Sequence, residues 1–169
     1  MEVVSGLLTI LVGTSRETSD FIADAIERWW TTNQERWVSI RTLTIDLDNG
    51  PENASCRTQF IKRMVAFADR HQREIELVYY PPYHSKYNPI ERVWGVLENH
   101  WKGQLLDSVE KVIGLAKTMK YNGKNPVVKY ILGTYEKGVK LTTKAMEQLE
   151  KMIDRVTGIE KWAVDIPWY

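Results

Sequence analysis

IRTLTIDLDNGP, residues 40–51, holds a strand and the turn that ends it. Over residues 40–47, apolar side chains alternate with polar ones, which is the pattern of a strand with one buried face. The four residues that follow, 48–51, all favour turns. The sequence therefore predicts a strand that carries Asp48 at its carboxyl end.

Helical and strand patterns alternate on both sides of this stretch. The predicted strands cover residues 3–12, 40–47 and 75–80, and the predicted helices cover residues 17–34, 54–71, a segment that begins after Asn88, residues 108–121 and residues 143–156. Strands that alternate with helices pair in parallel, and each crossover helix lies on the sheet. We therefore expect an α/β fold in which Asp48 and the loop of residues 81–87 lie at the ligand-binding edge.

The composition is that of a globular protein. The chain has 169 residues, of which 43% are hydrophobic and 27% are charged. No apolar run approaches the roughly 20 residues that a membrane span needs. Cys56 is the only cysteine, so no internal disulfide can form, and this fits a reducing cytoplasm. The apolar start lacks the basic region of a signal peptide and is interpreted as a strand.

Positive charge is concentrated late in the chain. Residues 111–144 contain eight lysines and a single acid, Glu136, with Tyr121, Tyr130 and Tyr135 between the lysines. A basic segment with interleaved tyrosines is typical of contact with a nucleic-acid backbone. A solvated helical surface explains the same charges equally well.

Two acids are candidates for chemistry. Asp48 follows a strand, and Glu91 opens the helix reached from the next strand end, 43 residues later. One strand–helix–strand unit between them would let both side chains reach one crevice. Carboxylates held on rigid elements are ligands that Mg²⁺ prefers, and a pair of such ions can cleave a phosphodiester.

Each acid also has a purely structural explanation. Asp48 could form an Asx-turn, in which its side chain bonds the backbone two residues on. Asn88 and Pro89 begin a helix well, and Glu91 could complete a capping box there. Asp46 is the competing candidate for the catalytic role, because it would share a strand face with Asp48. Asp48 is preferred because it lies at the strand exit.

A longer motif surrounds Glu91. Residues 79–95 read YYPPYHSKYNPIERVWG, which resembles the signature of bacterial insertion-sequence DDE transposases related to the mariner group. Residues 47–53, LDNGPEN, are similar to the element that carries the second acid of that family. Together the two motifs cover about 30 residues, and the order of strands and helices matches from residue 3 to about residue 121.

This resemblance implies a ribonuclease H-like fold, dependence on Mg²⁺ or Mn²⁺, and DNA cleavage and strand transfer at transposon ends. It also implies a bacterial cytoplasmic protein that is associated with the nucleoid. By position, Asp48 would be the second metal ligand and Glu91 the third. The residues expected to support them are Asn49, Asn88 and Pro89. The residues expected to contact DNA are Lys86, Arg92, Lys117, Lys120 and Lys124.

The resemblance is incomplete at the N-terminal end. The first Asp of the family pattern and the helix–turn–helix that reads transposon ends have no counterpart here, so we expect an N-terminally truncated catalytic domain over residues 1–121. A mostly helical extension is expected over residues 122–169. Such a chain would have little activity alone. The alternative is a non-catalytic remnant that binds DNA or self-associates, since the strand at residues 3–12 could offer a free edge to a second copy or to an N-terminal fragment.

Overall fold

The computed structural model describes residues 1–81, 83–84 and 87–169. Contacts divide the chain into two compact units. Unit 1 comprises Met1–Ser15 and Lys86–Thr134, and unit 2 comprises Arg16–Ser85 and Tyr135–Tyr169. The positions of the two units relative to each other are not determined, so each is described by itself.

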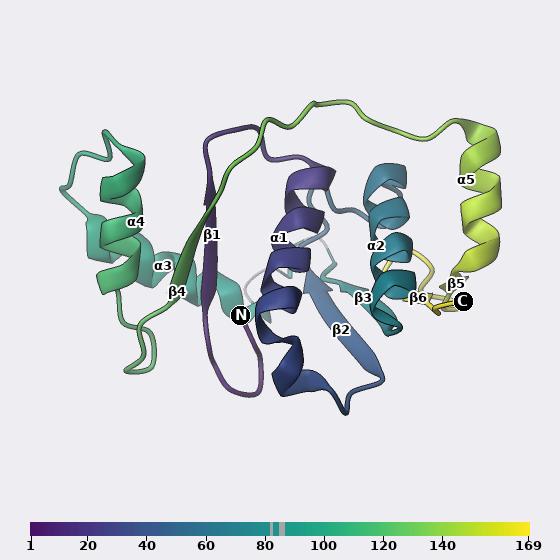
Figure 1. Cartoon of the computed structure of the whole chain (residues 1–169), viewed down its shortest axis with the longest axis horizontal. Helices are drawn as coiled ribbons and strands as arrows, with labels where there is room; N and C mark the ends of the chain where they lie inside the picture. Colours follow the sequence, from purple (N-terminus) through teal and green to yellow (C-terminus); the bar gives the residue numbers. More distant parts are fainter. Residues whose placement is uncertain (82, 85–86) are drawn as a thin grey trace. The chain divides into compact units, whose positions relative to one another are not determined.

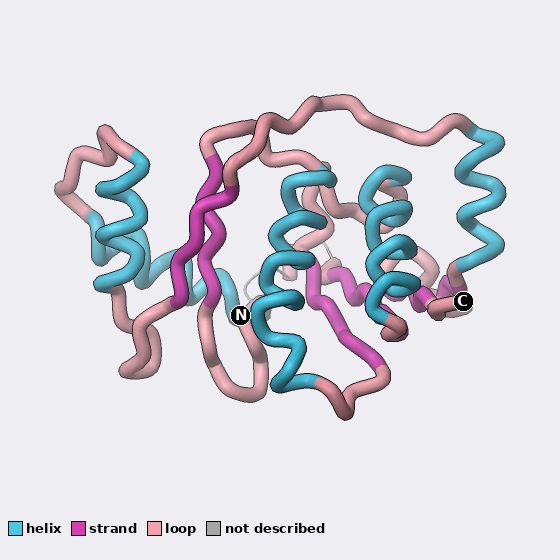
Figure 2. Tube along the Cα trace, viewed as in Figure 1, coloured by secondary structure: helices cyan, strands magenta, loops and turns pink. Residues whose placement is uncertain are grey.

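Unit 2 is built on a four-stranded sheet with the strand order β2-β3-β6-β5 (Figures 1 and 2). Its strands are β2 (Thr42–Leu47), β3 (Glu74–Tyr79), β5 (Asp154–Arg155) and β6 (Ala163–Ile166). Its α-helices are α1 (Ser19–Asn33), α2 (Thr58–His71) and α5 (Thr143–Leu149), and its 3-10 helices are η1 (Gln34–Trp37) and η3 (Glu150–Met152). β2 and β3 are parallel, with Leu47 opposite Tyr79, whereas β6 is antiparallel to both β3 and β5.

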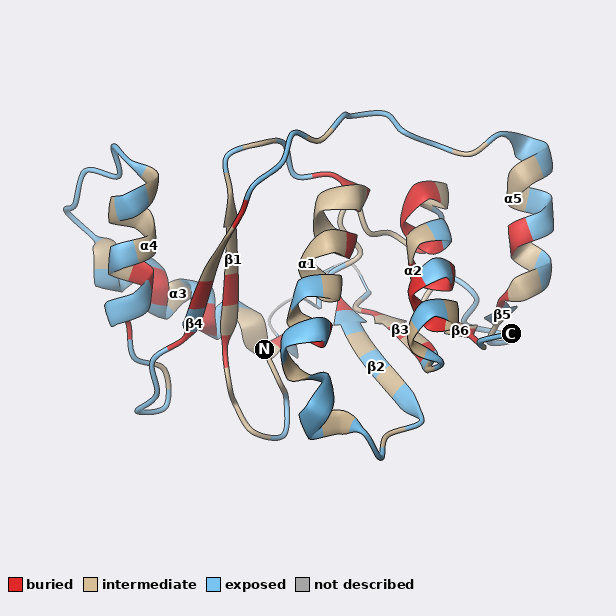
Figure 3. Ribbon diagram, in the orientation of Figure 1, coloured by how far each residue is buried: buried red, intermediate tan, exposed pale blue. Residues whose placement is uncertain are grey.

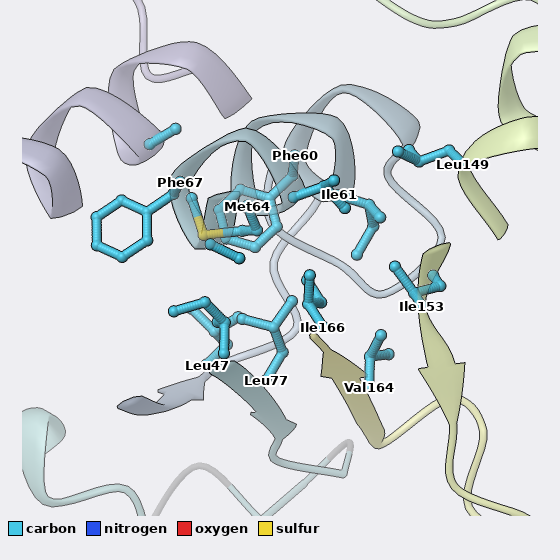
Figure 4. Close-up of a cluster of buried hydrophobic side chains, with 14 of the residues drawn as sticks. Leu47, Phe60, Ile61, Met64, Phe67, Leu77, Leu149, Ile153, Val164 and Ile166 are labelled. Atoms are coloured by element: carbon cyan, nitrogen blue, oxygen red, sulfur yellow. The ribbon is translucent and has the colours of Figure 1, made fainter. Parts of the chain in front are cut away.

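The core of unit 2 lies between one sheet face and the helices. Phe60, Ile61 and Met64 of α2 are fully buried and face Leu77 of β3, with Leu47 beside it (Figure 4). Figure 3 shows that α2 carries more buried positions than α1. Burying each such side chain contributes about 1.5–3 kcal/mol. The alternation predicted for residues 40–47 is therefore what places the apolar side of β2 against α2 and leaves its polar side outside.

Polar contacts join α1 to α2 at a partly buried flank. Arg63 of α2 donates to Asp20 at 2.7 Å and also bonds Asp24, and both acids belong to α1. Tyr135 donates its hydroxyl to Asp24 at 2.8 Å and packs edge-on against the ring of Phe21. Burial, followed by the hydrogen bond with Asp24, raises the pKa of Tyr135 to about 12. Tyr135 thus anchors the start of the segment that leads to α5.

Unit 1 contains a two-stranded parallel sheet and two helices. Its elements are β1 (Thr9–Gly13), α3 (Pro89–Trp101), α4 (Val109–Thr118) and β4 (Val127–Ile131). Thr9 lies opposite Val127, so the pair joins residues more than 100 positions apart (Figure 1). Val93 and Leu97 of α3 pack with Met119 in a separate hydrophobic core.

Most predicted elements are present, and the mixed α/β class is confirmed. The first strand begins at Thr9 instead of residue 3, because Gly6 has φ of +65° and donates to the Glu2 carbonyl in a turn. The second helix begins at Thr58 instead of residue 54, because Ala54 donates to the Gly50 carbonyl in another turn. No helix in the described part of the chain is long and apolar enough to cross a membrane.

The prediction of a mostly helical segment over residues 122–169 is wrong. This segment holds β4, β5 and β6, and its helix stops at Leu149 instead of residue 156. The helix gives way to η3 and then to β5, because the backbone at Ile153 is extended and Arg155 pairs with Val164. Strand pairing with β1 and β3 thus determines the structure of this part of the chain.

Candidate metal and DNA site

Asp48 lies one residue beyond β2 and is exposed. Its Oδ1 accepts hydrogen bonds from Gly50 N at 3.1 Å and from Asn53 Nδ2 at 2.9 Å. The first bond is the Asx-turn considered above, so this structural role is present. Neither bond uses Oδ2, and no described residue donates to it, so the turn leaves one carboxylate oxygen available for a ligand.

The turn after Asp48 depends on two residues with special backbone requirements. Asn49 has φ of +61°, a left-handed conformation that asparagine tolerates better than most residues. Gly50 is crowded, since a Cβ at this position would lie 3.2 Å from Asp48 Oδ1 and 3.3 Å from Asn53 Oδ1. The predicted supporting role of Asn49 therefore has a backbone basis, and Gly50 allows the two polar side chains to pack against the turn.

The rest of this loop is tied to the helices of unit 2. Ser19, which is 3% exposed, donates its hydroxyl to the Glu52 carbonyl at 2.7 Å. The Glu52 carboxylate pairs with Arg57 at 2.9 Å. These bonds hold the loop on both sides of Asn53, so Asp48 is presented from a supported turn.

Asp46, the competing candidate, has a different environment. It lies on the sheet face that points away from the helices, where Glu76 of β3 occupies the neighbouring strand. Burial and then the charge of Glu76 raise the pKa of Asp46. Since Asp46 lies within the strand and beside a like charge, the structure distinguishes it from Asp48, which stands at the strand exit.

Glu91 occupies the third position of α3 and is exposed. The buried Asn88 is the N-cap, because its Oδ1 accepts from Ile90 N at 3.2 Å, and Pro89 is the first helical residue. This helix start agrees with the prediction. The expected capping box does not form, since the Glu91 side chain has no hydrogen bond to any described residue. Its carboxylate is therefore available for another ligand.

The residues predicted to contact DNA lie in unit 1, except that Lys86 falls outside the described residues. Arg92 is exposed on the first turn of α3. Lys117, Lys120 and Lys124 are exposed at the end of α4 and around the tight turn at Asn122 and Gly123, both of which have positive φ. Lys124 also donates to the Ser5 carbonyl at 3.0 Å.

The basic segment of residues 111–144 is divided between the units. Its last three lysines, from Lys137 to Lys144, belong to unit 2. Two of its tyrosines have partners in the fold, since Tyr130 bonds Thr14 at 2.7 Å and Tyr135 bonds Asp24. The structure therefore gives these two hydroxyls packing roles, and the exposed lysines remain as the predicted contacts with DNA.

Asp48 belongs to unit 2 and Glu91 to unit 1, so their convergence at one site stays a prediction. Within residues 1–81, 83–84 and 87–169, no three His, Cys, Asp or Glu side chains gather in a way that could hold a metal ion. Each acid thus stands on a supported element, and no group of three such side chains surrounds either of them among the described residues.

Comparison with known proteins relates this geometry to a family. The family described as the Rhodopirellula transposase DDE domain matches residues 1–167. The chain belongs to this DDE transposase family. No curated protein and no solved structure matches it. Membership implies transposition-related DNA cleavage, with DNA as the substrate, and DDE transposases generally use a divalent metal.

The side chains around Asp48 suit such a metal. Mg²⁺ and Mn²⁺ prefer hard oxygen ligands, and Mg²⁺ is often held by one or two carboxylates together with substrate phosphates. Asp48 Oδ2 is unbonded in the described structure, and Asn53 Oδ1 is buried without a hydrogen-bond partner there. Asn53 has no role predicted from the sequence. Its only signal was its place in the LDNGPEN motif, because its contact with Asp48 depends on the geometry of the turn.

Proposed function

We propose that this chain provides the second and third metal-binding acids, Asp48 and Glu91, of a DDE transposase. The reaction is Mg²⁺- or Mn²⁺-dependent DNA cleavage and strand transfer at transposon ends, in an element of the mariner-like group of insertion sequences. The observation that supports this most is the family match over residues 1–167. The free carboxylates at the exit of β2 and in the first turn of α3 agree with it.

The residues of the chain have separable roles in this proposal. Bound cations would activate the attacking oxygen and stabilise the leaving oxygen of the phosphodiester. Asp48 offers Oδ2 while the turn holds Oδ1, and Glu91 is presented by a helix whose start is capped by Asn88. Arg92, Lys117 and Lys120 would neutralise backbone phosphates, which positions DNA without reading its sequence.

We further propose that the chain by itself has little cleavage activity. In the family pattern three acids hold the cations, and the residues of this chain are assigned only to the second and the third, Asp48 and Glu91. A polypeptide that supplies the remaining acid, such as an N-terminal transposase fragment, should restore cleavage. Self-association with a second copy of the chain is a separate proposal, because that copy lacks the same acid.

Site-specific NMR tests the two metal ligands. In the full chain, substoichiometric Mn²⁺ should broaden the amide signals around Asp48 and around Glu91, because a paramagnetic ion relaxes nearby nuclei. Asp48→Asn should remove the first effect and Glu91→Gln the second. The matched controls are Asp46→Asn on β2 and Glu98→Gln on α3, which should leave both effects in place. Broadening that persists in Asp48→Asn and disappears in Asp46→Asn would refute the assignment.

The second candidate function is a DNA-binding remnant without catalysis. It is favoured by Lys117 and Lys120, which are exposed and form no ion pair in the described part of the chain. In that case DNA affinity would fall steeply as the salt concentration rises. The logarithm of the binding constant would fall against the logarithm of the salt concentration with a slope of about −0.9 for each phosphate contact. DNA binding would not depend on a divalent cation. A requirement for Mg²⁺ or Mn²⁺ that is lost in Asp48→Asn would exclude this candidate.

A further inference from the structure

Among the described residues, the side chain of Asn53 makes one interaction, and that interaction is with Asp48. Its Nδ2 donates to Asp48 Oδ1 at 2.9 Å, whereas its Oδ1 is buried and accepts no hydrogen bond in the described structure. Because a carboxylate can only accept, the amide must turn its nitrogen towards Asp48. Leaving a buried oxygen unpaired is unfavourable, so the Asp48 contact alone accounts for the orientation of this amide.

The Asp48 and Asn53 side chains are packed together against the same turn. A Cβ placed on Gly50 would lie 3.2 Å and 3.5 Å from the two carboxylate oxygens and 3.3 Å from Asn53 Oδ1. The three oxygens therefore face one side of Gly50, where the missing side chain leaves them room. The Asn53 backbone N–H also donates to the Gly50 carbonyl at 3.2 Å, which closes the turn.

The loop that carries Asn53 is held independently of Asp48. Ser19 bonds the carbonyl of Glu52, the preceding residue, and Arg57 pairs with the Glu52 side chain. Asn53 is thus placed by α1 and by the residue next to α2, and not by the carboxylate that it touches. Because Asn53 is already fixed, it can restrict the rotation of the Asp48 side chain while losing little conformational entropy of its own.

We propose that Asn53 is a positioning residue for the Asp48 metal ligand. Its amide nitrogen holds Oδ1, so that Oδ2 is the oxygen presented to the divalent cation. This inference rests on the proposed function, since it assumes that Asp48 binds the cation. Outer partners that orient metal-binding side chains typically change metal affinity by about 10–100-fold when they are removed.

The test uses the full chain and Mn²⁺ broadening of the backbone amide signal of Asn49, which neighbours Asp48 and is unchanged in every variant. Asn53→Ser shortens the side chain so that it no longer reaches Asp48, and serine is well tolerated in turns. We expect the Mn²⁺ concentration that gives half-maximal broadening to rise by about tenfold or more. Gly50→Ala should also raise it, because the added methyl group pushes on both side chains without removing either.

Gln59→Ala is the matched control, because Gln59 also donates an amide N–H to a carboxylate, that of Asp20, at 2.9 Å in the same unit. It should alter the thermal unfolding midpoint but leave the Mn²⁺ effect at Asn49 unchanged. The positioning role would be overturned if Asn53→Ser and Gly50→Ala both need the same Mn²⁺ concentration as the wild type for half-maximal broadening, while Asp48→Asn shows no broadening. That result would leave the proposed function intact. Broadening that is absent in the wild type, or that survives in Asp48→Asn, would overturn the proposed function itself.

Discussion

Asp48 shows how a structural and a catalytic explanation can hold for the same residue. The Asx-turn that it forms uses only Oδ1, and the bond from Asn53 falls on the same oxygen. Glu91 differs, because in the described part of the chain its side chain does not form the expected capping box and the helix start is capped by Asn88. At the residue scale, the hydrogen bonds therefore leave both acids with oxygens free for a cation.

Sequence patterns predicted the places of these acids but not their partners. Alternation over residues 40–47 and the turn residues after it were enough to put Asp48 at a strand exit. The Asn53 contact could not be predicted, because it depends on the left-handed backbone at Asn49 and the close packing at Gly50. Such contacts arise from turn geometry and not from the spacing of residue types.

Asn49 gives a prediction about backbone conformation. A β-branched residue is strained at φ of +61°, whereas glycine adopts this conformation freely. Asn49→Val should lower the free energy of unfolding by about 1–2 kcal/mol. Asn49→Gly should stay within about 0.5 kcal/mol of the wild type. Urea denaturation measures both, and equal stabilities for the two variants would contradict the left-handed turn.

At the scale of elements, long and regular segments were predicted well. α1, α2 and α3 have apolar residues at helical spacing, and β2 and β3 alternate clearly. β5 and β6 were missed because they have only two and four residues, too few for a period to be visible. They are strands because β6 pairs with β3 and β5 pairs with β6. Local residue patterns do not indicate which distant segments will pair.

The outer face of this sheet carries opposed acids. Asp165 of β6 lies directly opposite Glu76 on β3 and Asp154 on β5. Burial, followed by the charges of Glu76, Asp154 and Glu74, raises the pKa of Asp165. A pKa that is higher in the folded than in the unfolded state means that ionisation of Asp165 destabilises the fold at neutral pH. This cost disappears as the pH falls below about 3.9, the unfolded value.

Asp165→Asn should therefore stabilise the protein at pH 7 by up to about 1 kcal/mol, since each like-charged cross-strand pair costs about 0.2–1 kcal/mol. The gain should shrink towards pH 4, where the acids become protonated. Denaturant titrations at both pH values provide the measurement. Glu147→Gln, at an exposed position of α5, is the control and should have little effect at either pH. A gain of the same size at both pH values would rule out the electrostatic cause.

At the scale of the whole molecule, the chain passes between its two units three times. The motif of residues 79–95 consequently begins in unit 2 and ends in unit 1, so the two acids of the family pattern are carried by different units. The sequence could not indicate this division, because unit 1 is closed by the pairing of β1 with β4. The predicted boundary at residue 121 stays a prediction about domains.

Cleavage of transposon-end DNA in Mg²⁺ or Mn²⁺ tests the central claim most directly. The assay compares the chain alone with the chain together with a transposase fragment that supplies the remaining acid. We expect little cleavage from the chain alone and clear cleavage from the combination. This cleavage should be lost in Asp48→Asn and in Glu91→Gln and kept in Asp46→Asn. Metal-dependent cleavage that survives both Asp48→Asn and Glu91→Gln would contradict the account, as would no cleavage by the combination.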